Sequence, residues 1–289
     1  MSVRVFAPAK INLTLKVGRP RADGLHPLES VVAFADVGDV IEAEAGEDLS
    51  LTISGDFADQ LAADEDNLVL RAARALAAAS GAPARARLAL EKHLPAASGM
   101  GGGSSDAVAT LRALNELWKL GWSTAQLVEI ARRLGSDAPV FLTQGGAGAF
   151  MTGAGEICAP MAMPSLPAVL INPLAPLATA DVYRAFDQLA LGTELAVSAP
   201  PRWQDENEAI AAMAALGNDL EAPARALEPR IGEILGELRG APGVRYAALS
   251  GSGATVFAVT RDWAGAESLA DLMRTRRPDW WVVETTLGA

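Results

Sequence analysis

The chain has 289 residues, of which 50% are hydrophobic and 20% charged, and its formal net charge is -11 at pH 7. This length allows one large or two smaller globular domains, and the balance of residue types excludes a long disordered chain. The negative charge argues against a nucleic-acid partner bound through phosphate contacts, so any phosphate-binding site has to be local. Cys158 is the only cysteine, which excludes an intrachain disulfide and a cysteine-based zinc site.

The N-terminal sequence MSVRVFAPAKINL lacks the basic-then-apolar order of a secretory signal. The apolar stretch LPAVLINPLAPLATA is interrupted by prolines and is too short to span a membrane. We therefore expect a cytoplasmic protein without a membrane or nucleic-acid partner. Nothing in the sequence decides between a monomer and a homodimer.

Short apolar runs rich in β-branched residues predict strands through the first part of the chain. These predicted strands cover residues 3–7, 11–17, 30–37, 39–45, 49–55 and 85–91. One helix interrupts them over residues 67–80, with Asn67 as its N-cap. Further along, apolar residues at helical spacing predict a helix that Gly121 ends, and Ser123 begins the next helix.

The second half of the chain mixes the two patterns. Apolar segments interrupted by glycine cover residues 145–156 and 168–173, and strand-like runs cover residues 244–260 and 280–287. Apolar residues at helical spacing predict four helices, over residues 179–190, 206–217, 228–240 and 265–277. We expect an α+β protein with an N-terminal domain of residues 1–158 and a C-terminal domain of residues 159–289. The ligand is expected between the two domains.

A glycine-rich stretch, PAASGMGGGSSD, lies where a predicted strand gives way to a helix. Glycine lets the backbone approach a ligand closely, and the N–H groups at a helix start attract phosphate. The stretch lacks the lysine of a G-x-x-x-x-G-K-[ST] loop, because Ser104 and Ser105 follow Gly103. It is therefore either a flexible connector or a phosphate-binding loop whose neutralising positive charge comes from elsewhere.

Three further segments carry residues that could take part in chemistry. Lys10, in APAKINL, is either a lysine that extends to the surface or a site residue beside a carboxylate. Asp137, in GSDAPVFL, is either a helix cap or a general base. The segment SGSG, residues 250–253, lies between two strand-like runs and could be only a hairpin turn.

In order and spacing, APAKINL, PAASGMGGGSS, GSDAPVF and LSGSGATVF resemble the motifs of the GHMP kinases, the superfamily of galactokinase, homoserine kinase and mevalonate kinase. The resemblance covers nearly the whole chain. It implies a two-domain α+β kinase fold with the active site in the cleft between the domains, ATP as phosphoryl donor, and Mg²⁺ bound with the nucleotide.

Three short segments narrow the resemblance to one branch of the superfamily. The segments RADGLH, DNL and NDLE are similar to those of the branch that phosphorylates the 2-hydroxyl of a cytidine diphosphate-linked methylerythritol. That branch serves the non-mevalonate route to isopentenyl diphosphate. The alternatives are a mevalonate- or homoserine-type kinase, or a nucleotide-binding relative that has lost catalysis.

The resemblance also implies roles for individual residues. Asp137 would contact the substrate and accept the proton of its hydroxyl, and Lys10 would keep that carboxylate ionised. The nucleotide would be bound by Pro95, Ala96, Ala97, Ser98, Gly99, Met100, Gly101, Gly102, Gly103, Ser104, Ser105, Asn67 and Lys92. Ser104 or Ser105 would touch a phosphate oxygen or Mg²⁺, and no set of protein ligands is assigned to the metal.

For the cytidine end of the substrate, the resemblance implies that His26 contacts cytosine and that Tyr183 stacks on the base. Asn12 and Thr179 would also bind the substrate. The alternatives are an ordinary surface histidine and a core tyrosine. Many relatives carry a tyrosine where this chain has Leu25, so the chain is expected to discriminate between bases less strictly.

Overall fold

The structure, a computed structural model, describes residues 2–143, 147–195 and 199–288. The chain forms two compact units, each made of several segments. Unit 1 comprises Met1–Ala9, Val37–Ala96 and Gly101–Thr143, and unit 2 comprises Lys10–Asp36, Ala97–Met100 and Gln144–Ala289. The predicted domain boundary after residue 158 lies within the last segment of unit 2 and stays a prediction. The glycine-rich stretch is shared between the units.

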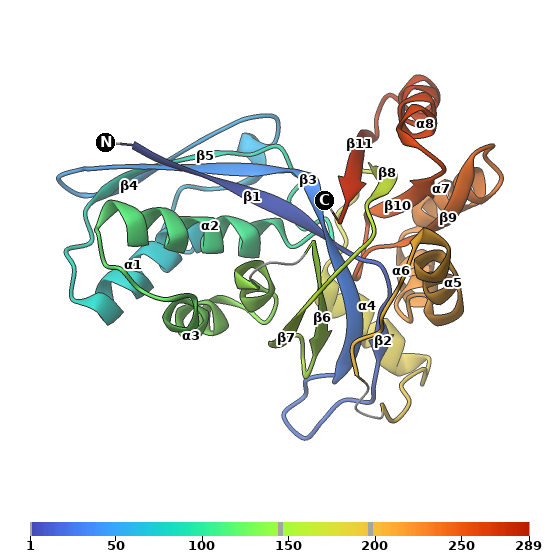
Figure 1. The fold of residues 1–289 in the computed structure, drawn as a ribbon, viewed down its shortest axis with the longest axis horizontal. Helices are drawn as coiled ribbons and strands as arrows, with labels where there is room; N and C mark the ends of the chain where they lie inside the picture. Colours follow the sequence, from blue (N-terminus) through green and yellow to red (C-terminus); the bar gives the residue numbers. More distant parts are fainter. Residues whose placement is uncertain (1, 144–146, 196–198, 289) are drawn as a thin grey trace. The chain divides into compact units, whose positions relative to one another are not determined.

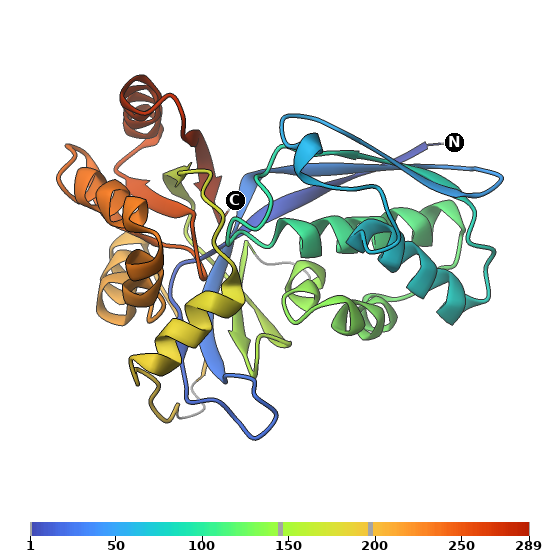
Figure 2. The ribbon, with the colours of Figure 1, turned by 180° about the vertical axis from the view of Figure 1, so that it is seen from behind.

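Unit 1 is a sheet covered on one face by helices (Figures 1 and 2). Its strands come from β1 (Ser2–Asn12), β3 (Leu28–Glu44), β4 (Leu49–Ser54) and β5 (Ala86–Glu91), and its helices are η1 (Ala58–Gln60), α1 (Leu68–Ser80), α2 (Gly102–Leu117), α3 (Thr124–Leu134) and η2 (Ala138–Leu142). The strand order is β4–β5–β3, with β1 also paired to β3. The two predicted strands at 30–37 and 39–45 form one continuous strand, which passes from unit 2 into unit 1.

The helix starts of unit 1 follow the capping residues of the sequence. The Asn67 side chain accepts a hydrogen bond from the backbone N–H of Val69, and Ser123 forms a capping box with Gln126. These predictions are confirmed. The predicted end of α2 at Gly121 is wrong, because the helix stops at Leu117 and Lys119 adopts a φ of 53°, outside the helical region.

Unit 2 combines a largely antiparallel sheet with five helices among the described residues. The strands are β2 (Lys16–Val17), β6 (Gly148–Thr152), β7 (Ile157–Met161), β8 (Leu166–Asn172), β9 (Val244–Leu249), β10 (Val256–Thr260) and β11 (Trp281–Leu287), and the helices are α4 (Thr179–Gln188), α5 (Glu206–Leu216), α6 (Glu221–Leu227), α7 (Pro229–Arg239) and α8 (Trp263–Arg276). The main order is β3–β11–β8–β10–β9. Strands β9 and β10 form an antiparallel hairpin, so the alternative of a hairpin turn at residues 250–253 is confirmed.

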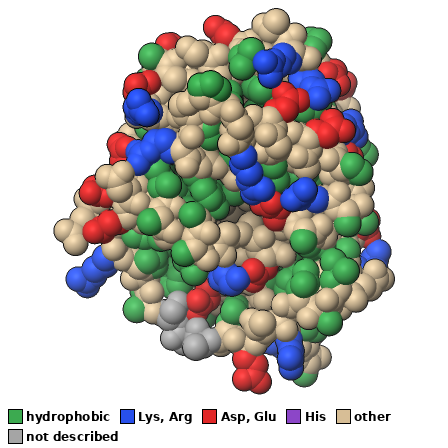
Figure 3. All heavy atoms as spheres, turned by 90° about the vertical axis from the view of Figure 1, so that its right-hand side faces the viewer, with side chains coloured by type: hydrophobic (Ala, Val, Ile, Leu, Met, Phe, Trp, Pro, Cys, Tyr) green, Lys and Arg blue, Asp and Glu red, His purple; other side chains and the backbone are tan. Residues whose placement is uncertain are grey.

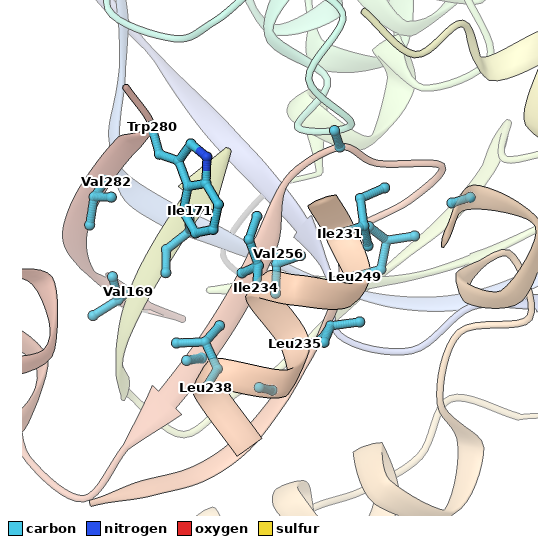
Figure 4. Close-up of a cluster of buried hydrophobic side chains, with 14 of the residues drawn as sticks. Val169, Ile171, Ile231, Ile234, Leu235, Leu238, Leu249, Val256, Trp280 and Val282 are labelled. Carbon is cyan, nitrogen blue, oxygen red and sulfur yellow. The ribbon is translucent and has the colours of Figure 1, made fainter. Parts of the chain in front are cut away.

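The core of unit 2 lies between helix α7 and this sheet (Figure 4). Ile231, Ile234 and Leu238 are fully buried on one face of α7. They pack in one cluster with sheet residues such as Ile171 and Val256, which are paired across β8 and β10. Burying these large aliphatic side chains stabilises the sheet by roughly 1.5–3 kcal/mol for each side chain. The hairpin loop 250–255 therefore extends from a well-packed support.

The surface of unit 2 carries charges of both signs. On the face shown in Figure 3, Lys and Arg side chains are interspersed with Asp and Glu side chains. Among the helices of the described ranges, none combines the length and apolarity that crossing a lipid bilayer requires.

Candidate functional site

Residues 97–100 of the glycine-rich stretch belong to unit 2 and are bonded to the hairpin loop 250–255. The backbone N–H of Thr255 donates to the Ser98 carbonyl at 3.1 Å, and Ser250 Oγ donates to the Gly99 carbonyl at 3.2 Å. Met100 accepts from the backbone N–H of Lys10 at 2.9 Å. The two Gly-Ser motifs, far apart in the sequence, are thus one structural element.

Gly99 shows why this contact requires glycine. Its φ is +80°, and a Cβ atom there would lie 2.6 Å from the Gly253 carbonyl oxygen and 2.7 Å from the Ser250 carbonyl oxygen. Both neighbours are backbone atoms that cannot rotate away. Glycine is therefore required at this position for two reasons: the backbone has a positive φ, and the two backbone segments leave no room for a Cβ atom.

Lys10 is part of a buried hydrogen-bond chain. Its ammonium donates to Asn12 Oδ1 at 2.9 Å, Asn12 Nδ2 donates to Ser30 Oγ at 2.7 Å, and Ser30 Oγ donates to the Thr14 carbonyl at 2.6 Å. Lys10 is 5% exposed, so the surface-lysine alternative is wrong. Both polar atoms of the Asn12 side chain are bonded within this chain, which fixes the orientation of the amide and of the lysine head group.

The second part of the stretch begins α2 in unit 1. Gly101, at a φ of 69°, precedes the helix and supplies no side-chain cap. The first N–H groups of a helix have no acceptor within the helix, and the helix dipole adds partial positive charge there. Within the described chain, the buried Ser105 Oγ also has no hydrogen-bond partner. The helix start thus offers donors that suit an anion.

Lys92 is buried between two carboxylates at the start of α2. Its ammonium contacts Asp39 Oδ2 at 2.5 Å and Asp106 Oδ2 at 2.8 Å. Burial lowers the pKa of Lys92, but the charges of Asp106 and Asp39 outweigh it, so that the pKa is raised above its ordinary value. Burial raises the pKa of Asp106 to about 7 despite the opposing effect of Lys92, and Asp39 adds to the rise.

His26 lies in a partly aromatic corner of unit 2. Its ring is 5.0 Å from that of Tyr183 and 5.9 Å from that of Phe186, between centroids. The Nδ1 atom contacts the Gly18 carbonyl at 2.9 Å, and Nε2 is 3.4 Å from Asp187 Oδ2. The histidine side chain is 8% exposed, which rules out an ordinary surface histidine. Tyr183 is partly buried and packs against the core of unit 2, as expected for a core tyrosine. Its ring also lies beside that of His26.

Two other predicted residues have clear local settings. Thr179 Oγ1 lies 2.9 Å from Ser252 Oγ, which connects the start of α4 to the hairpin loop. Asp137 is half-buried at the N-cap position of η2, and its side chain makes no capping hydrogen bond. The helix-cap alternative for Asp137 is therefore wrong. Lys10 belongs to unit 2 and Asp137 to unit 1, so their pairing stays a prediction.

The sequence did not reveal three residues that support these groups: Asp39, Ser30 and Asp187. Asp39 and Ser30 are fully buried polar residues within long apolar runs, and Asp187 lies on a helix that looks amphipathic. A polar residue inside a predicted core strand is the one signal that could have identified the first two, because buried polar groups require partners.

Comparison with known proteins places this chain in a family. The model for the GHMP kinases N terminal domain matches residues 67–145, and that for the GHMP kinases C terminal region matches residues 201–276. A Rhodopseudomonas palustris (strain BisB18) protein named 4-diphosphocytidyl-2-C-methyl-D-erythritol kinase is 46% identical over 100% of this chain and 97% of its own. A Methylorubrum extorquens (strain PA1) protein of the same name is 47% identical over 98% of both chains.

Solved structures agree with the sequence relatives. A crystal structure of 4-(cytidine 5'-diphospho)-2C-methyl-D-erythritol kinase has a TM-score of 0.78 at 34% identity and covers 99% of each chain. Homoserine kinase from Cytophaga hutchinsonii has a TM-score of 0.74 at 19% identity, over 99% of this chain and 95% of the other. The second match supports the fold alone.

Proposed function

The chain belongs to the GHMP kinases, and from this premise we propose that it transfers the γ-phosphoryl group of ATP to the 2-hydroxyl of 4-diphosphocytidyl-2-C-methyl-D-erythritol. The observation that carries the proposal is full-length identity of 44–48% with relatives named as the kinase of this compound. The product would enter the non-mevalonate route to isopentenyl diphosphate, in the cytoplasm. The chain would act as a monomer or a homodimer.

The glycine-rich stretch would bind the nucleotide, with Asn67 and Lys92 nearby. Support comes from the start of α2, where Gly101 leaves the first N–H groups without a side-chain cap. The buried, unpartnered Ser105 Oγ in the described chain adds a hydroxyl donor for a phosphate oxygen. Donors fixed in advance cost no reorganisation when negative charge arrives. The bonds of Ser98 and Gly99 to the hairpin loop, and of Met100 to the Lys10 backbone, would hold this part of the stretch in place.

Asp137 and Lys10 would carry the chemistry. The proton of the substrate 2-hydroxyl passes to the Asp137 carboxylate, the oxygen forms a bond to the γ-phosphorus, and ADP leaves as the bond to its terminal oxygen breaks. Lys10, oriented by Asn12, would offset the charge on the attacking oxygen.

Mg²⁺ would accompany ATP and neutralise phosphate charge. Among the described residues, no group of three or more His, Cys, Asp or Glu side chains is placed to hold a metal ion. Magnesium commonly keeps several waters and binds through substrate phosphates and one or two protein oxygens. The Ser105 hydroxyl at the start of α2 is compatible with this mode, in which the nucleotide supplies most of the ligands.

The cytidine end would bind at His26 and Tyr183. Both ring nitrogens of His26 face protein oxygens, so its ring is fixed in position before any ligand arrives. A base stacked on Tyr183 would gain roughly 0.5–1.5 kcal/mol beyond area burial. Leu25 is 53% exposed and adds an apolar side chain where many relatives have a ring.

A coupled assay tests this function. Formation of ADP is followed with ATP and Mg²⁺ while the acceptor is 4-diphosphocytidyl-2-C-methyl-D-erythritol, mevalonate or homoserine. Turnover with the first compound alone is expected. Turnover with mevalonate or homoserine instead would assign the chain to another branch of the superfamily, and no turnover with any acceptor would contradict a kinase function.

A further inference from the structure

Asp39, Lys92 and Asp106 connect the two ends of the glycine-rich stretch inside unit 1. Asp39 Oδ1 accepts hydrogen bonds from the backbone N–H groups of His93 at 2.6 Å and Leu94 at 2.9 Å, immediately before the stretch begins. Its Oδ2 atom accepts from Lys92, whose ammonium also contacts Asp106 within α2. One continuous chain of charged hydrogen bonds therefore runs from the entry of the stretch to its exit.

The packing around this chain leaves little freedom. Asp39 is fully buried, and Lys92 and Asp106 are each 2% exposed. A Cβ atom on Gly102 would lie 3.1 Å from Lys92 Nζ and 3.6 Å from Asp39 Oδ2, so the helix start rests directly on the ion pair. Charge-assisted hydrogen bonds are short and directional, and in a low-dielectric interior a distorted one is costly.

We propose that Asp39, with Lys92 and Asp106, is a positioning group that sets the shape of the glycine-rich stretch for the phosphates of ATP. This proposal rests on the proposed function. It also gives Lys92 a specific part, because its ammonium acts on the nucleotide through the helix start that it holds. Asp39 is separated by more than fifty positions from the residues it holds, and the resemblance to the GHMP kinases assigned it no role.

A charge-based account of the same residues predicts the opposite result for one variant. When Asp106 is ionised, the group of two carboxylates and one ammonium carries excess negative charge beside the expected phosphates. If its effect on ATP were electrostatic repulsion alone, Asp39→Asn would tighten nucleotide binding by removing a negative charge. If the group positions the stretch, the same variant weakens binding. An amide has one oxygen and one nitrogen, so it cannot accept hydrogen bonds from both Lys92 and the backbone of residues 93 and 94.

The experiment compares wild type, Asp39→Asn and Ile41→Val by calorimetric titration with Mg²⁺ and a non-hydrolysable ATP analogue, and separately with the cytidine substrate. Ile41 is a fully buried residue two positions along the same strand and controls for a mild loss of stability. Circular dichroism confirms folding. Lys92→Met would leave two buried carboxylates without their cation and could fail to fold, so Asp39→Asn is the deciding variant.

We expect Asp39→Asn to bind the analogue about tenfold more weakly, which corresponds to about 1.4 kcal/mol, with unchanged affinity for the cytidine substrate. Ile41→Val should bind both ligands as wild type does. Equal or tighter binding of the analogue by Asp39→Asn, or equal weakening for both ligands, would overturn the proposal and leave the kinase function standing. Failure of the wild type to bind the analogue would instead overturn the proposed function, and the positioning role with it.

Discussion

Ser30 Oγ accepts a hydrogen bond from Asn12 Nδ2 at 2.7 Å, and Asn12 in turn accepts one from the Lys10 ammonium at 2.9 Å. A serine on β3 thereby determines how the amide of Asn12 is turned and where the lysine head group lies. All three residues are buried. The position of the Lys10 head group therefore depends on a hydroxyl that is two hydrogen bonds away.

Ser30→Ala should lower kcat by about 10- to 100-fold, because a misplaced group loses much of its effect in the transition state. The dissociation constant of the ATP analogue should stay unchanged. The matched control is Thr260→Val in unit 2, which removes a buried hydroxyl bonded to the Pro167 and Asp262 carbonyls. Steady-state kinetics of both variants check this, and a similar kcat for Ser30→Ala and wild type would contradict the orienting role.

Gly99→Ala should lower both stability and nucleotide affinity, because its Cβ would overlap two backbone carbonyl oxygens. Gly81→Ala is the matched control: its φ is +74°, but a Cβ there meets nothing within 4 Å. In the control, the free energy of unfolding should fall only by the strain of an alanine in the left-handed conformation, about 1–3 kcal/mol. Thermal unfolding and analogue titration of both variants measure the difference, and equal losses would show that φ alone explains the glycine.

The stability of unit 1 should depend on pH through Asp106. Its pKa in the folded state, about 7, lies above the ordinary value of 3.8, so between these values the folded state holds a proton that the unfolded state has lost. The free energy of unfolding should therefore fall as the pH rises from about 4 to about 7, by at most about 1.4 kcal/mol per pH unit from this group. Lys92, with its raised pKa, stays charged throughout this range.

Urea unfolding of wild type and Asp106→Asn at about pH 5 and about pH 8 isolates this contribution, since all other titrating groups are shared. Wild type should be more stable relative to the variant at the lower pH. The same stability difference at both pH values would mean that Asp106 does not titrate in this range.

Tyr183→Leu should raise the KM for the cytidine substrate by roughly 2- to 10-fold, because the base loses one ring contact worth about 0.5–1.5 kcal/mol. Tyr183→Phe keeps the ring and should behave like wild type. The KM for ATP should be the same in all three proteins. An equal rise in both KM values for Tyr183→Leu would indicate a core residue without a substrate contact.

The sequence was informative where structure depends on neighbouring residues. The caps at Asn67 and Ser123 and the helix that follows the glycine run are local patterns, and they are confirmed. The hairpin between β9 and β10 was one of the alternatives that the sequence offered for residues 250–253. Family resemblance identified the fold and the kinase motifs.

The residues that support the site could not be predicted from the sequence. The contact of Asp39 with residues 92–94 and that of Ser250 with Gly99 depend on how distant segments pack. The sequence predicts the end of α2 at Gly121 because glycine is a common stop signal, whereas the chain leaves the helical conformation earlier, at Lys119.

Asp137 and Lys10 lie at the centre of the proposed mechanism. Asp137→Asn keeps the shape of the side chain but cannot accept the hydroxyl proton in the same way, and Lys10→Ala removes the charge near the attacking oxygen. Each variant should lower turnover by about 10²- to 10⁴-fold while circular dichroism shows a folded protein.

The most direct test is phosphorus NMR of the reaction of the wild type with 4-diphosphocytidyl-2-C-methyl-D-erythritol, ATP and Mg²⁺, with Asp137→Asn run in parallel. We expect one new phosphomonoester signal from the 2-hydroxyl position, formed by the wild type and nearly absent with the variant. A phosphate at another position, or product formed at the wild-type rate by Asp137→Asn, would contradict this account.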